Sequence, residues 1–413
     1  MNDLPGGPTV GKHWKATVAL VLMLTAADLR ADEFKLTPSV AVRQEYNSNI
    51  FFDSSNEKDD FITRVKPGLE LIERTERLDL RLAGFVIPYV YWDNDNLNSV
   101  DQDYSGRADY KLTPLLSVGA NAAVRVDHQP DRDIYTTGLA YGDNRRIQQR
   151  YGGNLGYMFT ELMGASVAYD YTREDWRESS NSDLEDYDSH AVTLGLSREL
   201  GAAKGVTVGL LNAGWAHYNY ETSDTDYYFG TIGLKHRLTE IFNVSADVGA
   251  RYTDSSFKVQ QLAIVPPGVL AIVTENESDS GWGGIGHLAV EYVGETTRAS
   301  LGASHDINAS SGSQGVVQRT GLTFNGGHLL TEKLRLGAYA GAFRNKSDEN
   351  EFSGEKIEEY SYSASPSLRW EFYRDVTLEA GYSFTYLDDQ EGDQGSVRHL
   401  GYVQIAYGLP LFE

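Results

Sequence analysis

From about residue 33 onward, apolar and polar residues alternate along most of the chain with a period of two. In the segment 376–386, Val376, Leu378 and Tyr382 belong to one row, and Glu379 and Ser383 belong to the other. Successive side chains of a β-strand point to opposite faces, so this period predicts strands with one apolar and one polar face. The same alternation recurs at 116–127, 243–252 and 359–370. The chain is therefore predicted to be all-β.

The connections between these segments also alternate. Eight short turns are predicted, four of them near copies of one motif: Leu112-Thr113-Pro114, Phe159-Thr160-Glu161, Leu238-Thr239-Glu240 and Leu330-Thr331-Glu332, with the others near 74–75, 202–203, 293–294 and 374–375. Nine longer polar segments are predicted between them, near 47–60, 93–103, 129–146, 175–188, 221–226, 255–280, 308–314, 345–357 and 388–396. Together they give eighteen strands with both ends of the barrel sequence on the turn side.

Short turns at one end and long loops at the other are typical of bacterial outer-membrane barrels. The predicted fold is a transmembrane antiparallel up-and-down β-barrel of about 18 strands, with short periplasmic turns and long extracellular loops. A soluble propeller or sandwich is the alternative, but one apolar face per strand favours the barrel. In 78–92 the alternation breaks at Phe85, Ile87 and Pro88, which predicts a bulge or a register switch.

The first residues resemble a secretory signal. Lys12 and Lys15 precede an apolar run, 16–27, which is too short to span a bilayer as a helix. We expect cleavage after Ala31. Residues 1–31 are then a signal peptide, residues 32–413 form the outer-membrane β-barrel, and the predicted location is the cell outer membrane.

Aromatic residues cluster at strand ends, as expected for girdles at the two membrane interfaces. The predicted loop-end girdle is Tyr89, Tyr91, Trp92, Tyr169, Tyr171, Tyr218, Tyr220, Tyr227, Tyr228, Tyr252 and Tyr386. The predicted turn-end girdle is Phe159, Phe242, Trp370, Phe372 and Phe412.

Composition and charge limit the kinds of partner and cofactor that are expected. The net charge is −23 and the pI is about 4.8, which argues against nucleic acid as a partner. The chain has no cysteine, and its nine histidines are far apart in sequence. Most of the acidic excess lies in the predicted loops, which lack the twelve-residue calcium-loop pattern. We therefore predict no metal site and no cofactor.

The polar faces of the predicted strands carry an excess of basic residues. The pore-lining binding candidates are Arg43, Arg64, Lys66, Arg107, Arg125, Arg251, Arg298, Arg319, Arg335 and Arg369. A barrel of this size encloses water, so charged side chains are tolerated there. These bases either pair with neighbouring acids and keep the lumen wet, or form a track for an anionic polymer.

One predicted loop is apolar. Within 255–280, two apolar runs flank the turn Pro266-Pro267-Gly268, and Leu262 and Val269 belong to these runs. The segment either continues two wall strands beyond the membrane, folds inward as a gate, or docks a partner. The gate-loop candidates are Leu262, Pro266, Pro267, Gly268 and Val269.

Nothing in the sequence favours an enzyme. No Gly-x-Ser-x-Gly motif occurs, and strand geometry sends the adjacent Ser304, His305 and Asp306 to alternating faces.

The whole mature chain resembles the beta-barrel porin-2 family of Gram-negative outer-membrane proteins. The resemblance rests on Leu36-Thr37-Pro38-Ser39-Val40, on Tyr46-Asn47-Ser48-Asn49-Ile50-Phe51, and on the repeated turns. It implies the outer-membrane component of an exopolysaccharide export system, similar to the alginate exporter barrel.

The predicted function is a channel that serves as a conduit for an exopolysaccharide. The alternatives are a general diffusion porin for small solutes and a structural or adhesive barrel. The expected partners are outer-membrane lipid, the barrel-assembly machinery, periplasmic polysaccharide-export proteins and an anionic polysaccharide.

Overall fold

The computed structural model describes residues 33–129, 144–177, 184–201, 206–265, 269–310, 315–348, 351–354, 356–390 and 394–411. In these residues it has eighteen strands and one short 3₁₀ helix, η1. Their bounds are β1 Glu33–Asn47, β2 Asp60–Arg74, β3 Leu78–Tyr91, η1 Asp95–Leu97, β4 Ser99–Lys111, β5 Leu116–Asp127, β6 Arg145–Thr160, β7 Met163–Arg177, β8 Tyr187–Glu199, β9 Thr207–Tyr220, β10 Ser223–Arg237, β11 Phe242–Val265, β12 Val269–Val293, β13 Thr297–Ala309, β14 Val316–Leu329, β15 Leu334–Ser347, β16 Ile357–Tyr373, β17 Val376–Asp389 and β18 Gln394–Gly408.

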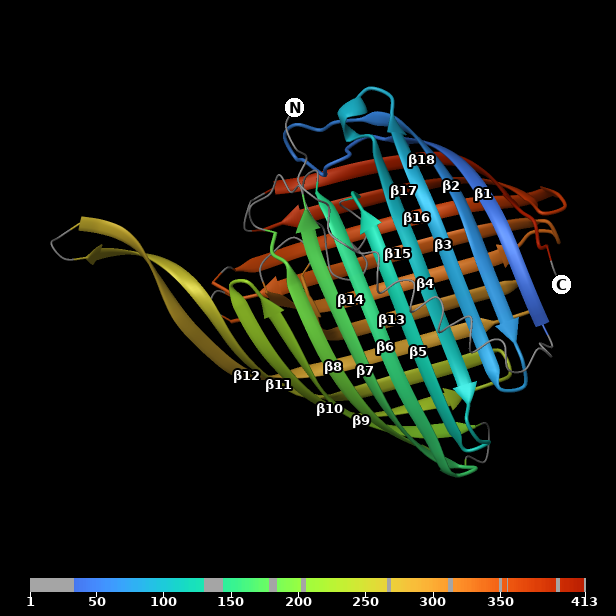
Figure 1. Ribbon diagram of the computed structural model, residues 1–413, viewed down its shortest axis with the longest axis horizontal. Coiled ribbons are helices and arrows are strands. Elements are labelled where there is room, and N and C mark those ends of the chain that lie inside the picture. Colours follow the sequence, from blue (N-terminus) through green and yellow to red (C-terminus); the bar gives the residue numbers. More distant parts are fainter. Residues whose placement is uncertain are drawn as a thin grey trace, which may run out of the picture.

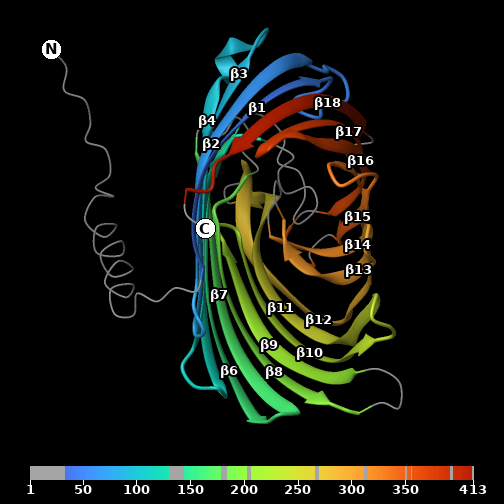
Figure 2. The same cartoon turned by 90° about the vertical axis from the view of Figure 1, so that its right-hand side faces the viewer.

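The strands form one closed antiparallel barrel. Each strand pairs with its sequence neighbours, and β1 closes the sheet by pairing with β18 from Ser39↔Gly408 to Asn47↔Leu400. Figures 1 and 2 show the wall as a single tilted sheet wrapped around an interior space. Closure removes free sheet edges, which is the condition for a sheet to cross a lipid bilayer. The predicted transmembrane barrel and its strand number are confirmed.

The repeated turns share one physical cause. The Thr113, Thr239 and Thr331 hydroxyls each accept hydrogen bonds from two backbone N–H groups, two and three residues later. The Thr75 hydroxyl accepts the same pair of bonds in the turn between β2 and β3. Threonine satisfies turn backbone groups that no neighbouring strand can reach. We call this side of the barrel the turn end and the opposite side the loop end.

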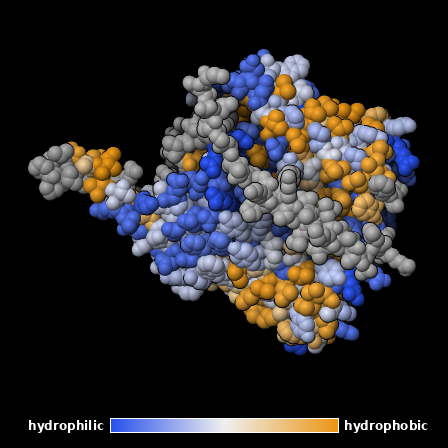
Figure 3. Space-filling view, viewed as in Figure 1, coloured by the Kyte–Doolittle hydropathy of each residue, from blue (hydrophilic) through white to orange (hydrophobic). Residues whose placement is uncertain are grey.

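Apolar side chains lie on the outside of the wall. Ile232, Val248 and Leu211 are 68%, 64% and 53% exposed. Figure 3 shows apolar patches over the outer wall. Aromatic pairs mark both ends of this surface, for example Phe242–Tyr292 and Trp370–Phe372 at the turn end, with ring centroids 5.0 and 5.6 Å apart. Such a surface is stable against lipid rather than water, so the outer face is the membrane-facing one.

Two local predictions are wrong. The register of β2 with β3 is the same on both sides of residues 65–67, so the switch predicted for 78–92 is absent. The bulges instead lie at Glu371/Tyr373 and Met158/Thr160. The predicted loop 221–226 is only two residues long, because β10 begins at Ser223.

The segment 255–280 is strand rather than loop, which is the first of the three arrangements that the sequence left open. β11 and β12 pair with each other as far as Val265↔Val269. However, β10 follows β11 only to Phe257, and β13 follows β12 only to Gly286. The remainder is a two-stranded ribbon that projects from the loop end (Figure 1). Among the described residues, no helix is long and apolar enough to cross a membrane.

Candidate functional site

The basic pore-lining candidates all lie at inward positions of their strands. On β1 and β16, Val42 and Trp370 are exposed on the outer face, so the neighbouring Arg43 and Arg369 point inward. The same alternation applies to the other eight candidates, which are Arg64, Lys66, Arg107, Arg125, Arg251, Arg298, Arg319 and Arg335. They do not form one cluster but fall into the groups described below.

The first group crosses four strands. The Arg369 guanidinium lies 2.6 Å from a Glu379 carboxylate oxygen, and the Tyr402 hydroxyl donates to the other oxygen at 2.6 Å. The Arg43 guanidinium is 3.6 Å from the centroid of the Tyr402 ring and 2.7 Å from the Glu45 carboxylate. Cations, an aromatic ring and carboxylates thus alternate from β16 to β1.

The second group continues this row over β2 to β5. Arg64 stands opposite Arg43 in the strand register and donates to the Tyr89 hydroxyl at 3.5 Å. The Lys66 ammonium lies 3.9 Å from the centroid of the Phe85 ring, and Arg125 approaches Asp103 at 3.5 Å. We call the inward row made by these two groups, from Arg369 on β16 to Arg125 on β5, the basic–aromatic belt.

Beside the belt lies a buried ion cluster that the sequence analysis missed. Arg146, only 1% exposed, donates to Glu174 at 2.8 Å and to Asp127 at 3.2 Å. Gln148 donates to the same Glu174 oxygen at 2.7 Å. Arg146 was assigned to the predicted loop 129–146, but β6 begins one residue earlier, at Arg145. Its charge is satisfied, so this cluster fixes β5, β6 and β7 to one another.

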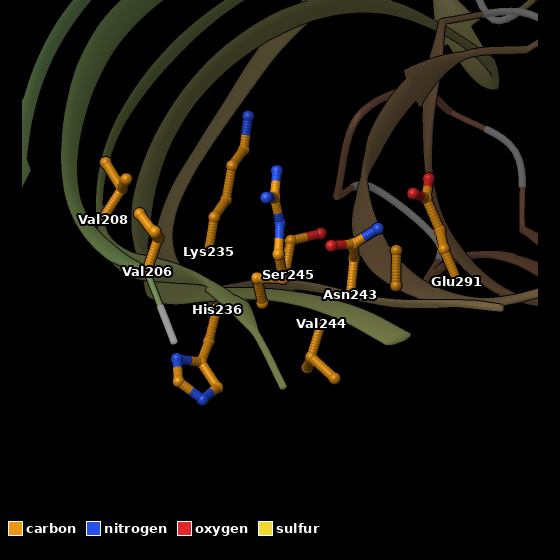
Figure 4. Close-up of a pocket in the computed structure, with 10 residues that line it drawn as sticks. Val206, Val208, Lys235, His236, Asn243, Val244, Ser245 and Glu291 are labelled. Atoms are coloured by element: carbon orange, nitrogen blue, oxygen red, sulfur yellow. The ribbon is translucent and has the colours of Figure 1, made fainter. Parts of the chain in front are cut away.

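The turn end of the lumen is lined by more basic residues. A cavity of about 390 Å³ lies against β10 to β12. Lys235 and Glu291 point into the interior there, whereas His236 points away from it (Figure 4). Arg298 and Arg335 line a smaller cavity nearby, of about 140 Å³. Arg107 is exposed inside the barrel and lies 2.6 Å from Asp109.

The loop end of the barrel is filled by parts of its own chain. We call the loop-end segments of β13 and β14, Asp306–Ser310 and Gly315–Arg319, the flap. Ile307 and Val316 of the flap belong to an apolar cluster with Tyr187 and Tyr220, which lie on the inner face of β8 and β9. The outer face of the flap therefore packs against the inner wall, and the flap lies within the barrel.

A second segment joins the flap. Phe352, between β15 and β16, is 1% exposed and belongs to the same apolar cluster. The adjacent Glu351 accepts a hydrogen bond from Gln318 of the flap at 2.6 Å. Since Phe352 comes from β15–β16 and its partners come from β8–β10, the cluster crosses the lumen. We call the flap together with Glu351–Gly354 the plug.

The loop between β1 and β2 also turns inward. Ile50 packs on Ile62 and Tyr89 of the inner wall, and Phe52 is 1% exposed with the Arg398 guanidinium 4.4 Å from its ring centroid. Backbone N–H groups of Ser55 and Asn56 donate to Asp53 and lower the pKa of its carboxyl. This loop therefore also packs against the inner wall at the loop end.

The predicted gate loop lies elsewhere. Leu262 is 75% exposed on the ribbon, which projects away from the lumen. Val269 begins β12 on the same ribbon, and Pro266, Pro267 and Gly268 lie outside the described residues. The ribbon continues two wall strands, the first of the arrangements considered above. A gating role for these five residues stays a prediction.

Several tyrosines assigned to the loop-end girdle face inward instead. Tyr89, Tyr91, Tyr220 and Tyr227 are each 5–6% exposed. One signal was available in the sequence. Tyr227 and Tyr228 are adjacent, so only one of them can face lipid, and it is Tyr228 that is 48% exposed. Phe352 carried no comparable signal, since it is one aromatic residue in an acidic loop.

No hydrolytic arrangement is assembled from the adjacent Ser304, His305 and Asp306. His305 contacts the Thr320 hydroxyl at 2.8 Å, while Asp306 accepts a hydrogen bond from the Tyr227 hydroxyl at 2.6 Å. Within the described part of the chain, no group of three or more histidine or acidic side chains is placed to hold a metal ion.

No family model matches the chain, and no curated protein matches it. Solved structures with similarity to it include outer-membrane receptors and porins. The closed form of the ferric-catecholate import receptor Fiu from E. coli K12 has 7% identity and a TM-score of 0.48, over 90% of this chain and 82% of that one. OpdO from Pseudomonas aeruginosa has 12% identity and a TM-score of 0.44, over 92% and 98%. OccAB4 from Acinetobacter baumannii has 10% identity and a TM-score of 0.46, over 92% and 99%.

With TM-scores below 0.5, these likenesses carry no argument about the function of this chain. The barrel assignment rests on its own strand pairing. The resemblance to the porin-2 family is not supported beyond the barrel itself.

Proposed function

We propose that this protein is an outer-membrane channel that conducts a hydrophilic, anionic polymer, with an exopolysaccharide on its way out of the cell as the cargo. The turn end faces the periplasm and the loop end faces the outside, as in bacterial barrels generally. The plug closes the outer end until cargo or a partner displaces it. The protein itself catalyses no reaction.

The basic–aromatic belt is the observation that carries this proposal. Arg43, Lys66 and Arg64 present cations and aromatic partners in a row on the inner wall. Guanidinium groups bind carboxylates through paired hydrogen bonds, and ring faces offer flat surfaces for stacking. Many weak sites in a row let a chain bind and still move, which is the requirement for conduction.

A general diffusion porin is the second candidate. It is favoured by the acids that accompany several lumenal bases, such as Asp109 beside Arg107 and Glu379 beside Arg369. Pairs of this kind leave a hydrated lumen without a strong preference for one charge. In that case small solutes would pass and a polymer would have no special affinity.

Blockade by defined oligosaccharides in a planar bilayer separates the two candidates. Trigalacturonate and neutral maltotriose, of similar size, are added in turn to the turn-end side of the purified Phe352→Ala variant, because the proposed plug leaves the wild type with little current to block. A polymer channel is blocked by trigalacturonate at concentrations where maltotriose has no effect. Equal, weak effects of both sugars would favour the diffusion porin and contradict the proposal.

Partners follow from the same proposal. The barrel-assembly machinery would insert the chain, with residues 1–31 acting as the export signal. Periplasmic polysaccharide-export proteins would deliver the polymer to the turn end, where Lys235 and Glu291 point into the lumen. The channel would supply no energy of its own.

A further inference from the structure

Arg251 is a buried cation without a close partner. It lies at an inward position of β11 and is 3% exposed. Within the described residues, its Nε atom makes no hydrogen bond, and no carboxylate lies within 4.0 Å of the guanidinium; the Phe352 ring lies on one side of it, with the ring centroid 5.9 Å away. Glu351 and Asp306 act on it only from a longer distance.

Other buried arginines in the described structure are engaged. Arg146 binds two carboxylates, and Arg319, 4% exposed, donates to the Asn345 side chain at 2.5 Å. The acids nearest Arg251 already have other donors. Asp306 accepts from Tyr227 at 2.6 Å, and Glu351 accepts from Gln318 at 2.6 Å. Burying an unpaired charge is costly, so such a group is normally paired or waiting for a counter-charge.

A glycine on the neighbouring strand leaves space for this guanidinium. Gly283 stands opposite Arg251 in the register of β11 with β12. A Cβ atom on Gly283 would lie 2.6 Å from the Arg251 Cζ atom. The side chain therefore lies flat over a glycine, below the Phe352 ring of the plug.

We propose that Arg251 is an anion-binding subsite of the lumen, roofed by Phe352, that takes one carboxylate, sulfate or phosphate group. The inference rests on the proposed function and deepens it: the ligand would be an acidic group of the polymer where it first meets the plug. Arginine suits this role because its planar fork can hold two oxygens of one anion.

Calorimetry on the full chain in detergent tests the subsite without requiring conduction. Trigalacturonate, inorganic sulfate and neutral maltotriose are titrated into the wild type, Arg251→Gln, Arg251→Lys and Gly283→Ala. The matched control is Arg344→Gln, which removes an arginine on the outer face. Gly283→Ala keeps the charge and displaces the guanidinium. Circular dichroism and heat-dependent gel migration confirm that each variant is a folded barrel.

We expect the wild type to bind trigalacturonate and sulfate and to ignore maltotriose. Arg251→Gln should weaken both anions at least about tenfold, the loss expected for a charge-assisted hydrogen bond pair. Gly283→Ala should weaken them too, and Arg344→Gln should not. Arg251→Lys should retain part of the affinity.

Wild-type affinity in both Arg251→Gln and Gly283→Ala would overturn the subsite, as would equal binding of maltotriose. If Arg251→Gln does not fold, Gly283→Ala and Arg251→Lys carry the test. Anion binding at Arg251 in a barrel that trigalacturonate fails to block would leave the subsite standing and refute polymer conduction.

Discussion

At the scale of single residues, the barrel contains both buried and exposed arginine–carboxylate pairs, and the two kinds differ in what they contribute to stability. Arg146 is 1% exposed and binds two carboxylates, whereas Arg344 on the outer face is 41% exposed and pairs with one carboxylate, that of Glu358. A buried pair that loses one partner leaves the other charge stranded in a region of low polarity. An exposed pair exchanges its partner for water at little cost.

Replacement of Arg146 by alanine is therefore expected to lower the free energy of unfolding by about 3 to 5 kcal/mol, because Asp127 and Glu174 lose their shared cation. Denaturant unfolding of the barrel in lipid measures this change. Arg344→Ala is the matched control and should stay within about 1 kcal/mol of the wild type. Equal effects of the two variants would show that the Arg146 cluster adds no stability.

Glu185, in the loop before β8, makes the stability of the folded barrel depend on pH. Burial raises the pKa of its carboxyl above the ordinary value of 4.5, although Thr222 donates two hydrogen bonds to it. A raised acid pKa means that the ionised form destabilises the native state above the folded pKa. That penalty disappears as the pH falls below the ordinary value.

The wild type should thus gain stability relative to Glu185→Gln when the pH is lowered from 7 to 4.5. The gain should come from the wild type alone, because the uncharged amide of the Glu185→Gln variant has no proton to take up in this range. Unfolding midpoints of both proteins across this range measure it. A difference that stays constant with pH, or grows as the pH rises, would contradict the assignment.

The residue scale also shows what a sequence can and cannot supply. Inward and outward positions follow from strand alternation, which is local, so the ten basic pore-lining residues could be placed on the inner wall. Their partners could not, because the stack of Arg43 on Tyr402 joins residues 359 positions apart only through barrel closure. In the sequence, Arg251 is equivalent to the nine other candidates; only the three-dimensional structure shows that its buried Nε has no hydrogen-bond partner.

At the scale of elements, the ribbon and the flap have a common origin. β13 turns into the lumen beyond His305, so β12 loses its neighbour above Gly286. On the other side, β10 begins only at Ser223, after a two-residue connection from β9, so β11 has no neighbour on that side beyond Phe257. Beyond these points, β11 and β12 pair only with each other. The inward course of the flap and the projection of the ribbon therefore both follow from the separation of β12 and β13 beyond Gly286.

Removal of the ribbon should leave the channel unchanged. Val259 and Glu275 face each other across the ribbon, so residues 260–274 can be replaced by an Asn-Gly turn. Because the ribbon lies outside the lumen, we expect a folded barrel with the same single-channel current as the wild type. A marked rise in current on this deletion would contradict this expectation and would show that the ribbon residues, including Leu262, act as the gate.

The sequence could not reveal this arrangement for a physical reason. Apolar side chains on the ribbon, such as Leu262 and Ile272, have the same period as the membrane-facing ones. Strand patterns report which face is apolar but not which neighbour is present. The separation of β12 from β13 depends on the packing of Val316 and Ile307 against tyrosines more than 80 positions earlier in the chain. Contacts of that range leave no local signature.

At the scale of the whole molecule, the barrel has an apolar outer wall, a charged inner wall and a loop end into which the plug folds. In the proposed closed state, Phe352 is the residue on which closure depends most directly. It brings the β15–β16 connection into contact with the flap and with Tyr187 and Tyr220 on β8 and β9. A single buried ring thus connects two sides of the lumen.

Single-channel recording of Phe352→Ala in a planar bilayer tests this account most directly. The matched control is Phe61→Ala, which removes a phenyl ring from the outer face, where Phe61 is 49% exposed. We expect the wild type and Phe61→Ala to conduct little. Loss of the Phe352 ring should release the plug and raise the open-channel current severalfold. A large, steady wild-type current that Phe352→Ala leaves unchanged would contradict the closed-channel account.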